Sequence, residues 1–292
     1  MLSILIPTFN YNALPLAKIL EQQALKSGII FELLCIDDGS FSEKNNKNQL
    51  INSLTNSKFF ENKKNVGSKA NRERLAEIAQ YNWLLFIDAD SKPKETNYLA
   101  KYISQINNSY DAIFGGIAYY PKQEGSSKSL RYKFGRNREE IDAKIRNKNP
   151  FKVITSANFI IKKLIFLKIT DQRTPNIYGL DYLFSLQLKE HNVRVKHIND
   201  EVYHLGLDTN SDFLNKTRKA VEALHYTYKI KKIKKHNISL LSTYKIMTGF
   251  GLKAPFRWLF KKFKNKIEHN LIGKKPNLFL FDLYRLGYLC SL

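Results

Sequence analysis

The amino-acid sequence predicts an α/β fold, a mostly parallel but mixed sheet flanked by helices, followed by a basic helical region. Three observations predict it. Short apolar runs of strand length alternate with segments of helical periodicity through the first two thirds of the chain. Acidic residues directly follow two of those apolar runs. Beyond residue 212 the pattern becomes helical and rich in Lys and Arg.

The predicted strands are apolar almost throughout, as expected for strands buried on both faces. They cover residues 2–6, 29–36, 58–61, 83–87, 111–119, 153–161 and 194–198. The predicted helices cover residues 14–25, 42–54, 69–79, 96–106 and 179–191. Residues 121–150 are polar and charged, and we expect them to form a mobile segment over one face. In such sheets ligands bind beyond the carboxyl ends of the strands, so a site is expected at that edge.

Composition restricts the class of protein. The chain has 292 residues, 43% of them hydrophobic, which is enough to bury a large core. Two cysteines far apart in sequence imply no disulfide framework and suit a reducing compartment. The residues after Met1 predict a strand and not a signal peptide, and there is no apolar run of eighteen residues. We therefore expect a cytoplasmic location.

The net charge of +22 is unevenly distributed. The 88 residues from Leu205 onward contain 18 Lys or Arg and 5 Asp or Glu, which gives +13, and the rest of the chain carries +9. Such a basic tail indicates an anionic partner, which can be lipid headgroups, nucleic acid or a phosphorylated substrate. The alternative is that the lysines only keep the protein soluble.

Two carboxylates follow the apolar run 83–87. Asp88 and Asp90 flank the small residue Ala89, so both can reach one point at the strand end. Hard divalent cations prefer oxygen ligands of this kind and share the rest of their shell with phosphates and water. Without a cation the two carboxylates would repel each other. The same pattern occurs in surface loops without function, and it is the preceding buried strand that favours a metal site here.

A second acidic pair, Asp37 and Asp38, ends the apolar run 29–36 and is followed by Gly39 and Ser40. A carboxylate here can accept hydrogen bonds from a base N–H group or a ribose hydroxyl. Gly39 permits a turn with positive φ. The alternative is that Asp38 or Ser40 only caps the following helix.

Four motifs occur in an order that resembles the family 2 glycosyltransferases, which have the GT-A fold. They are Ile4-Leu-Ile-Pro-Thr-Phe-Asn10, Cys35-Ile-Asp-Asp-Gly-Ser40, Asn65-Val-Gly67 and Leu85-Phe-Ile-Asp-Ala-Asp90. The match covers residues 1–208. We therefore expect a catalytic domain at 1–208 and a basic helical region at 209–292 that associates with a membrane surface.

The resemblance implies an inverting glycosyltransferase that uses a nucleoside-diphosphate sugar, a UDP-sugar by expectation, with Mn²⁺ or Mg²⁺. It places Asp37 and Asp38, Asp38 above all, at the base and ribose, and Asp88 and Asp90 at the metal and diphosphate. The other nucleotide-sugar residues that it implies are Pro7, Thr8, Asn10, Gly67, Arg72 and Ala89. Arg72 lies in Ala-Asn-Arg-Glu where the family more often has Ala-Arg-Asn, so its alignment departs from the family pattern.

The second half of the chain resembles the family's catalytic element. Ile177-Tyr-Gly-Leu-Asp-Tyr182 is similar to its Gly-x-Glu-Asp motif, which makes Asp181 the general base and places Tyr178 and Gly179 at the acceptor. Leu180 replaces the usual glutamate, and Asp181 can alternatively cap the helix that it begins. Asn158 resembles a residue beside the acceptor. His204 resembles a third metal ligand or a diphosphate-binding histidine, and a core histidine is the alternative reading.

In the tail, apolar residues at helical spacing form a stripe whose neighbours are basic. The stripe consists of Phe256, Leu259, Phe260, Phe263 and Ile267. Such a helix suits an anionic membrane surface, and the alternative is that the stripe packs against the protein. We expect a glycan or lipid-linked acceptor at the inner face of the plasma membrane, in cell-envelope polysaccharide biosynthesis.

Three other functions fit the sequence less well. A nucleic-acid-binding protein would explain the charge, but four aspartates at strand ends would repel phosphate. A sugar nucleotidyltransferase would need a Gly-rich basic loop after the first strand, where this chain has Pro7-Thr-Phe-Asn10. A catalytically degenerate relative is suggested by Leu180 and Glu73.

Overall fold

The computed structural model describes residues 1–107, 109–121, 126–170, 181–231 and 238–292. The chain forms two compact units. Unit 1 consists of Met1–Ala118, Glu140–Asn176 and Gln187–Gly206, and unit 2 consists of Tyr119–Glu139, Ile177–Leu186 and Leu207–Leu292. Two segments within the first 208 residues thus join the C-terminal region in unit 2.

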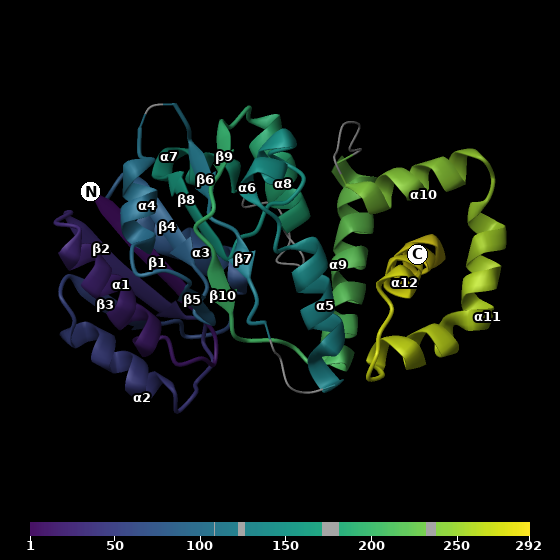
Figure 1. The fold of residues 1–292 in the computed structure, drawn as a ribbon, viewed down its shortest axis with the longest axis horizontal. Coiled ribbons are helices and arrows are strands. Elements are labelled where there is room, and N and C mark those ends of the chain that lie inside the picture. Colours follow the sequence, from purple (N-terminus) through teal and green to yellow (C-terminus); the bar gives the residue numbers. More distant parts are fainter. Residues whose placement is uncertain (108, 122–125, 171–180, 232–237) are drawn as a thin grey trace. The chain divides into compact units, whose positions relative to one another are not determined.

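Unit 1 contains a seven-stranded mixed sheet with the order β3-β2-β1-β4-β8-β6-β9 (Figure 1). Its strands are β1 (Leu2–Thr8), β2 (Phe31–Asp37), β3 (Ser57–Glu61), β4 (Trp83–Ile87), β6 (Ala112–Phe114), β8 (Asn158–Lys162) and β9 (Val195–His197). The first four are parallel to one another, β8 is antiparallel to both of its neighbours, and β6 is parallel to β9. The expected mostly parallel mixed sheet is therefore confirmed.

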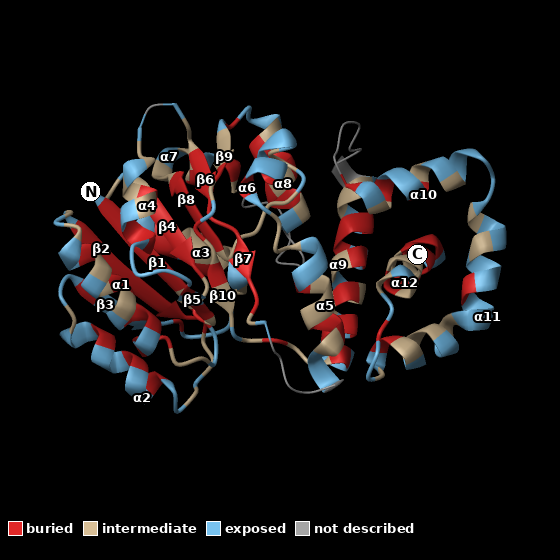
Figure 2. Ribbon diagram, viewed as in Figure 1, coloured by how far each residue is buried: buried red, intermediate tan, exposed pale blue. Residues whose placement is uncertain are grey.

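The central strands are buried on both faces, as their apolar sequences predict (Figure 2). Three aromatic rings extend the core across the antiparallel strands: Phe86 stacks on Phe159 at 5.0 Å, and Phe159 stacks on Phe114 at 5.4 Å between ring centroids. The helices of unit 1 are α1 (Leu14–Lys26), α2 (Asn45–Asn48), α3 (Ser68–Ile78), α4 (Tyr98–Ser104), α6 (Ala143–Lys148) and α7 (Lys163–Ile169), with a 3-10 turn at Gln49–Ser53.

A second, three-stranded sheet with the order β5-β10-β7 was not predicted. Its strands are β5 (Ser91–Pro93), β7 (Ile117–Ala118) and β10 (Val202–His204). Each is only two or three residues long, too short to give an alternating pattern in the sequence. Strand β10 runs antiparallel to β5, with His204 opposite Ser91. This pairing brings residues 202–206 alongside the segment that follows β4.

The single strand predicted at 111–119 was wrong in its extent. It is divided by Gly115 and Gly116 into β6 and β7, which belong to different sheets. A Cβ atom on Gly115 would lie 2.4 Å from the carbonyl oxygen of Asp200, so the chain crosses between sheets where only glycine fits. The described part of residues 121–150, which we expected to be mobile, contains α5 (Ser129–Arg138) and α6, with Arg131 and Arg146 buried.

Unit 2 is helical in its described part. It contains α5, α9 (Asn210–Lys231), α10 (Ser239–Gly249), α11 (Lys253–Ile272) and α12 (Leu278–Ser291), and α8 (Asp181–Glu190) begins in this unit and ends in unit 1. The expected basic helical extension is present. Among the described residues no helix is long and apolar enough to cross a membrane.

The apolar stripe of the tail is divided between the protein interior and the surface. Phe260 packs on Tyr284 of α12 at 5.6 Å between ring centroids, and its ring covers Gly287, whose added Cβ would approach it to 2.3 Å. Ile267 packs into the same cluster. Leu259 and Phe263, in contrast, are exposed. The inner half of the stripe therefore stabilises unit 2 through contacts between α11 and α12.

Candidate functional site

Three strands of unit 1 end close together at the edge where ligands bind in folds of this type. Strands β1, β2 and β4 are parallel neighbours, and the residues that follow them are Asp38 after β2, Phe9 after β1 and Asp88 after β4. The candidate site is built from these ends, from the first turn of α3 and from the β5–β10 pair. All of these elements belong to unit 1.

Asp90 and His204 meet at this edge although they are 114 positions apart in sequence. His204 Nε2 lies 3.2 Å from Asp90 Oδ2, and both side chains are partly exposed. The amide of Leu205 donates to the carbonyl oxygen of Asp90 at 2.8 Å, which fixes the two segments against each other. A Cβ atom on Gly206 would lie 2.2 Å from Asp90 Oδ2, so the glycine leaves the space in which the carboxylate sits.

Asp88 is oriented by an arginine of α3. Arg72 forms an ion pair with Asp88 Oδ1, and its guanidinium also donates to the carbonyl and hydroxyl oxygens of Ser68 in the first turn of the helix. A weaker contact of 3.5 Å reaches the carbonyl oxygen of Ser156. Within the described residues the Nε atom of Arg72 is buried without a hydrogen-bond partner. An anion entering here would find an arginine already held in position.

Asp37 and Asp38 are both buried and accept hydrogen bonds from the surrounding loops. Asp37 binds the amide of Ser40 at 2.7 Å, the hydroxyl of Ser40 at 2.8 Å and the amide of Asn10 at 3.3 Å. The carboxylate of Asp37 therefore holds the turn after β2 against the loop after β1. Asn10 has φ of 51°, a conformation that asparagine tolerates better than most residues.

Asp38 fixes the turn that precedes α3. Its Oδ1 accepts from the Asn62 side chain at 3.0 Å and the Val66 amide at 2.9 Å, and its Oδ2 accepts from the Gly67 amide at 2.7 Å. Gly67 has φ of 87°, which requires glycine. The Asn65-Val66-Gly67 turn is thus built around the Asp38 carboxylate, whose Oδ2 has capacity for a second donor.

Pro7 and Thr8 end β1 beside these aspartates. Thr8 pairs with Asp37 in the sheet, and its carbonyl oxygen accepts from the Asp38 amide at 2.9 Å. The Thr8 hydroxyl donates to the carbonyl oxygen of Tyr11 at 3.4 Å. Burial, and then the negative charge of Asp90, raise the pKa of Tyr11. No sequence motif singled out Tyr11.

The donor atoms fit a divalent cation whose coordination shell is completed by a bound phosphate ligand and water. Asp90 and His204 supply one carboxylate oxygen and one imidazole nitrogen side by side, whereas Asp88 Oδ1 is engaged by Arg72. Among the described residues no group of three His, Cys, Asp or Glu residues could hold a metal. Hard cations bound with phosphates take only one or two protein carboxylates and fill the remaining positions with phosphate oxygens and water. The two-residue set meets that requirement.

Asn158 does not fit the expected place beside an acceptor. Its side chain is completely buried, accepts from the hydroxyls of Tyr98 and Tyr102 at 2.8 Å each, and donates to the carbonyl oxygens of Gly116 and Asp200 at 2.8 Å each. All of its hydrogen-bonding positions are used inside the protein. We therefore assign it to the junction of the two sheets and leave it out of the site.

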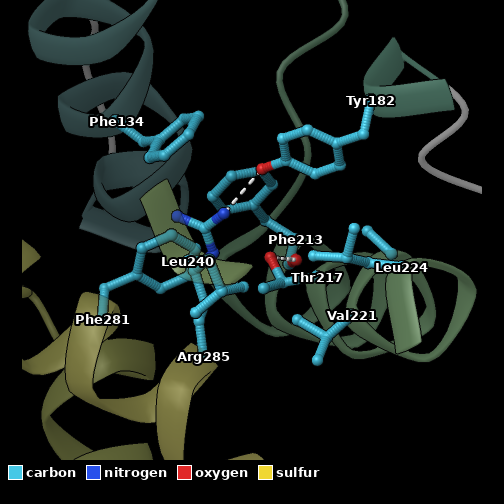
Figure 3. Close-up of a pocket in the computed structure, with 10 residues that line it drawn as sticks. Phe134, Tyr182, Phe213, Thr217, Val221, Leu224, Leu240, Phe281 and Arg285 are labelled. Atoms are coloured by element: carbon cyan, nitrogen blue, oxygen red, sulfur yellow. Dashed lines mark hydrogen bonds between the residues drawn. The ribbon is translucent and has the colours of Figure 1, made fainter. Parts of the chain in front are cut away.

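Asp181 lies in unit 2, where it is the exposed first residue of α8. Tyr178, Gly179 and Leu180 lie outside the described residues. The next residue, Tyr182, lines an apolar cavity of about 110 Å³ in unit 2 and accepts a hydrogen bond of 2.6 Å from Arg285 (Figure 3). The walls of the cavity include Phe134, Phe213 and Phe281.

Two further residues of the site were missed at the sequence level. Gly206 is needed because Asp90 occupies the space of its side chain, and Tyr11 lies near the Asp90 charge. The only sequence signal for Gly206 was its position two residues after His204, a candidate metal ligand. Tyr11 had none, since no local pattern in the sequence relates it to Asp90.

Comparisons with known proteins agree with this architecture. The sequence model described as glycosyl transferase family 2 matches residues 3–169, more than half of the chain. No curated protein sequence matches the chain.

Among solved structures, TarS from S. aureus is similar, with a TM-score of 0.51 and 16% identity over 78% of this chain and 44% of that chain. The chain thus spans less than half the length of that protein. A mannosyltransferase from Pyrobaculum calidifontis, in complex with GDP-Man and Mn²⁺, has a TM-score of 0.55 and 14% identity over 80% of this chain and 65% of that chain.

Glucosyl-3-phosphoglycerate synthase from Mycobacterium tuberculosis, in complex with Mn²⁺, UDP and its product, has a TM-score of 0.51 and 14% identity over 77% of this chain and 78% of that chain. At these identities the structures establish a shared fold, the GT-A fold, and the family match over residues 3–169 establishes the class. The chain belongs to glycosyl transferase family 2 and is a glycosyltransferase.

Proposed function

We propose that this glycosyltransferase moves a sugar from a nucleoside-diphosphate sugar, with UDP as the expected nucleotide, to a hydroxyl group of a glycan or lipid-linked acceptor. The observation that carries the proposal is the meeting of Asp90 with His204 next to the Arg72–Asp88 pair at the carboxyl edge of the sheet. Solved structures of similar fold hold UDP-GlcNAc, GDP-Man and UDP, which supports a donor of this class.

In the proposed donor site the nucleotide lies over the ends of β1 and β2. Thr8 borders it, and Asp38 offers the remaining capacity of its Oδ2 to a base N–H group or a ribose hydroxyl. Because the Asp38 carboxylate is already fixed by the Asn65–Gly67 turn, it is held in position before the donor arrives. Asn10 and Asp37 act on the donor through the shape of the loops, which their mutual hydrogen bond maintains.

The diphosphate is proposed to lie between Arg72 and the Asp90–His204 pair. Arg72 presents a planar fork of N–H donors that suits phosphate oxygens. Asp90 and His204 would hold the Mn²⁺ or Mg²⁺ ion, with Asp88 beside them at the ribose or diphosphate. When bound, such an ion neutralises the charge that develops on the leaving diphosphate.

Asp181 is proposed as the general base that accepts the proton of the acceptor hydroxyl. An alcohol is a poor nucleophile until its proton has a place to go, and a positioned carboxylate contributes roughly 10²–10⁴-fold. Asp181 is an exposed residue at the start of α8. Tyr178 and Gly179, which precede it, remain the proposed acceptor residues, and inversion at the anomeric carbon is inferred from the family alone.

A donor panel tests the proposal. Purified protein is incubated with Mn²⁺ and a set of UDP-sugars and GDP-sugars, and release of the nucleoside diphosphate is measured with and without acceptor glycans. The same reactions are run with Asp90→Asn and Asp181→Asn, and Glu77→Gln serves as control because Glu77 is an exposed carboxylate elsewhere on α3. Calorimetry measures how Mn²⁺ changes the affinity of each variant for the free nucleotide.

The two variants should fail differently. Asp90→Asn should lose the Mn²⁺-dependent gain in nucleotide affinity, whereas Asp181→Asn should keep that gain and lose about 100-fold or more in transfer rate. Full activity in both variants would overturn the site assignment. A wild-type protein that binds the nucleotide tightly but turns over no donor would instead identify a degenerate relative.

A further inference from the structure

Unit 2 exposes an unusual group of large apolar side chains where α10 passes into α11. Within residues 246–262, which we call the α10–α11 corner, five large apolar residues are exposed, and Figure 2 shows exposed stretches of both helices there. They are Ile246, Phe250, Leu252, Trp258 and Leu259. Single exposed apolar residues are normal on protein surfaces, but a group of this density marks an interaction site. Phe250, 77% exposed, and Trp258, 66% exposed, bury little of their rings in the protein.

The exposure of this corner follows from a well-formed turn and not from a frayed helix end. The amide of Leu252 donates to the carbonyl oxygen of Met247 at 2.8 Å, and that of Gly251 donates to the carbonyl oxygen of Thr248 at 3.2 Å. With Gly251 at φ of 70°, this is the Schellman arrangement that ends many helices. The backbone at Phe250 and Leu252 is therefore ordered by hydrogen bonds, and both residues are exposed.

The same corner is strongly basic. Residues 246–262 contain four basic residues, Lys253, Arg257, Lys261 and Lys262, and no Asp or Glu. Arg257, Lys261 and Lys262 project from α11 among the exposed apolar residues, and Lys262 Nζ lies 5.6 Å from the Trp258 ring centroid. In the part of the chain that the structure describes, none of these three cations forms an ion pair with a carboxylate. Their charge is available to an anionic partner.

We propose that the α10–α11 corner docks on an anionic lipid surface, with its apolar side chains inserted among the headgroups and its basic residues facing the lipid phosphates. Helix α11 is too polar to span a bilayer, so it would lie along the surface. The packed inner side of α11, through Phe260, is not involved because it contacts α12. This inference does not depend on which sugar the enzyme transfers.

Charge and side-chain type select lipid over other partners. A second copy of this chain would bring two basic surfaces together, which is unfavourable. Nucleic acid would satisfy the charge, but single-stranded nucleic acid binds through bases stacked on aromatic rings, and Ile246, Leu252 and Leu259 offer no such ring. Aliphatic and aromatic side chains mixed with lysines suit the boundary between headgroups and acyl chains.

Vesicle sedimentation tests the proposal with the full chain. Wild-type protein is mixed with vesicles of phosphatidylcholine alone, or of phosphatidylcholine and phosphatidylglycerol in equal parts. Lys261→Gln/Lys262→Gln removes two charges, and Phe250→Ser/Trp258→Ser removes two apolar anchors. The matched controls are Lys18→Gln/Lys58→Gln and Ile145→Ser/Leu164→Ser, which change exposed residues of unit 1. Circular dichroism verifies that each variant is folded.

Wild type should bind the anionic vesicles, weakly or not at all the neutral ones, and binding should decrease as salt is added. Removing the two charges should weaken binding about 30-fold, from roughly one kcal/mol per basic residue at such a surface. Removing the two apolar anchors should weaken it at least about 30-fold, since each buried large side chain contributes more than about 1 kcal/mol. Both control pairs should bind like wild type.

Three results would overturn the proposal. The first is equal sedimentation with neutral and anionic vesicles. The second is wild-type binding by both corner variants. The third is tighter binding to a single-stranded oligonucleotide than to the anionic vesicles at the same salt concentration, which would assign the corner to nucleic acid.

Discussion

Gly206→Ala is the sharpest test of the geometry at the candidate site. The substitution adds one methyl group at a position whose φ lies outside the left-handed region, so alanine fits the backbone. The added Cβ would lie 2.2 Å from Asp90 Oδ2 and 3.0 Å from Asp90 Cγ. Because the Asp90 backbone is fixed by Leu205, the carboxylate is the part that must move.

The size of the movement can be worked out from these distances. Ordinary contact begins at 3.4 Å, so the carboxylate oxygen, which lies 3.2 Å from His204 Nε2, must shift by about 1.2 Å. A misplacement of about 1 Å in a catalytic constellation costs roughly 100-fold in rate. We therefore expect kcat/KM to fall about 100-fold, equivalent to about 2.7 kcal/mol of transition-state stabilisation. The nucleotide affinity in Mn²⁺ should fall with it.

The assay combines donor turnover, a Mn²⁺ titration of nucleotide binding and thermal unfolding. Gly249→Ala is the matched control, since an added Cβ there meets nothing within 4 Å. Both variants should unfold close to the wild-type temperature, and only Gly206→Ala should lose turnover and metal dependence. If Gly206→Ala keeps wild-type kcat/KM and Mn²⁺ response, the Asp90–His204 pair is not the place where metal and diphosphate bind, and the reasoning fails.

Three further perturbations test other parts of the structure. Asn158→Leu leaves the hydroxyls of Tyr98 and Tyr102 and two buried carbonyl oxygens without their partner, so the free energy of unfolding should fall by about 3 kcal/mol or more; an unchanged melting temperature would contradict this. Burial raises the pKa of Asp200 from 3.8 to about 8, so the folded protein keeps a proton that the unfolded chain releases near pH 4. The unfolding free energy of wild type therefore falls as pH rises from about 4 and levels off above about 8. Relative to wild type, Asp200→Asn should gain unfolding free energy between about pH 5 and about pH 9; urea titrations that show the same difference at both values would refute the assignment. In Arg72→Lys, a single ammonium group takes the place of the forked guanidinium that contacts both Asp88 and Ser68. KM for the donor should therefore rise about tenfold, whereas an unchanged KM would exclude Arg72 from the site.

The sheet was predictable because its strands are apolar almost throughout and because acidic residues end two of them. Parallel strands buried on both faces leave this pattern in a single sequence, and β1, β2 and β4 were all recognisable. The second sheet was not predictable, since β5 and β7 have three and two residues. Its strands are recognised only through their pairing with β10, a contact between segments more than eighty residues apart.

For the site residues too, local patterns were predictable and long-range contacts were not. Asp88 and Asp90 could be identified because they follow a strong strand, and the sequence pointed to a shared point for both. The structure separates their partners: Asp88 pairs with Arg72 from α3, and Asp90 meets His204 from β10. A local motif cannot encode this, because each partner is supplied by a different long-range contact. The sequence likewise could not show that Asn158 is buried, since its partners Tyr98 and Tyr102 come from α4.

The two acidic strand ends also differ in what a ligand can use. Asp37 and Asp38 are buried and bound mostly by backbone amides, so their charge stabilises loops whether or not a donor is present. Asp88 and Asp90 are partly exposed and paired with the side chains of Arg72 and His204. Buried carboxylates held by loop amides suit recognition of a base and ribose, whose shape does not change in the reaction. Partly exposed carboxylates, which a cation can reach, suit a diphosphate whose charge changes as the sugar leaves, so the burial of each pair follows the part of the donor that we assign to it.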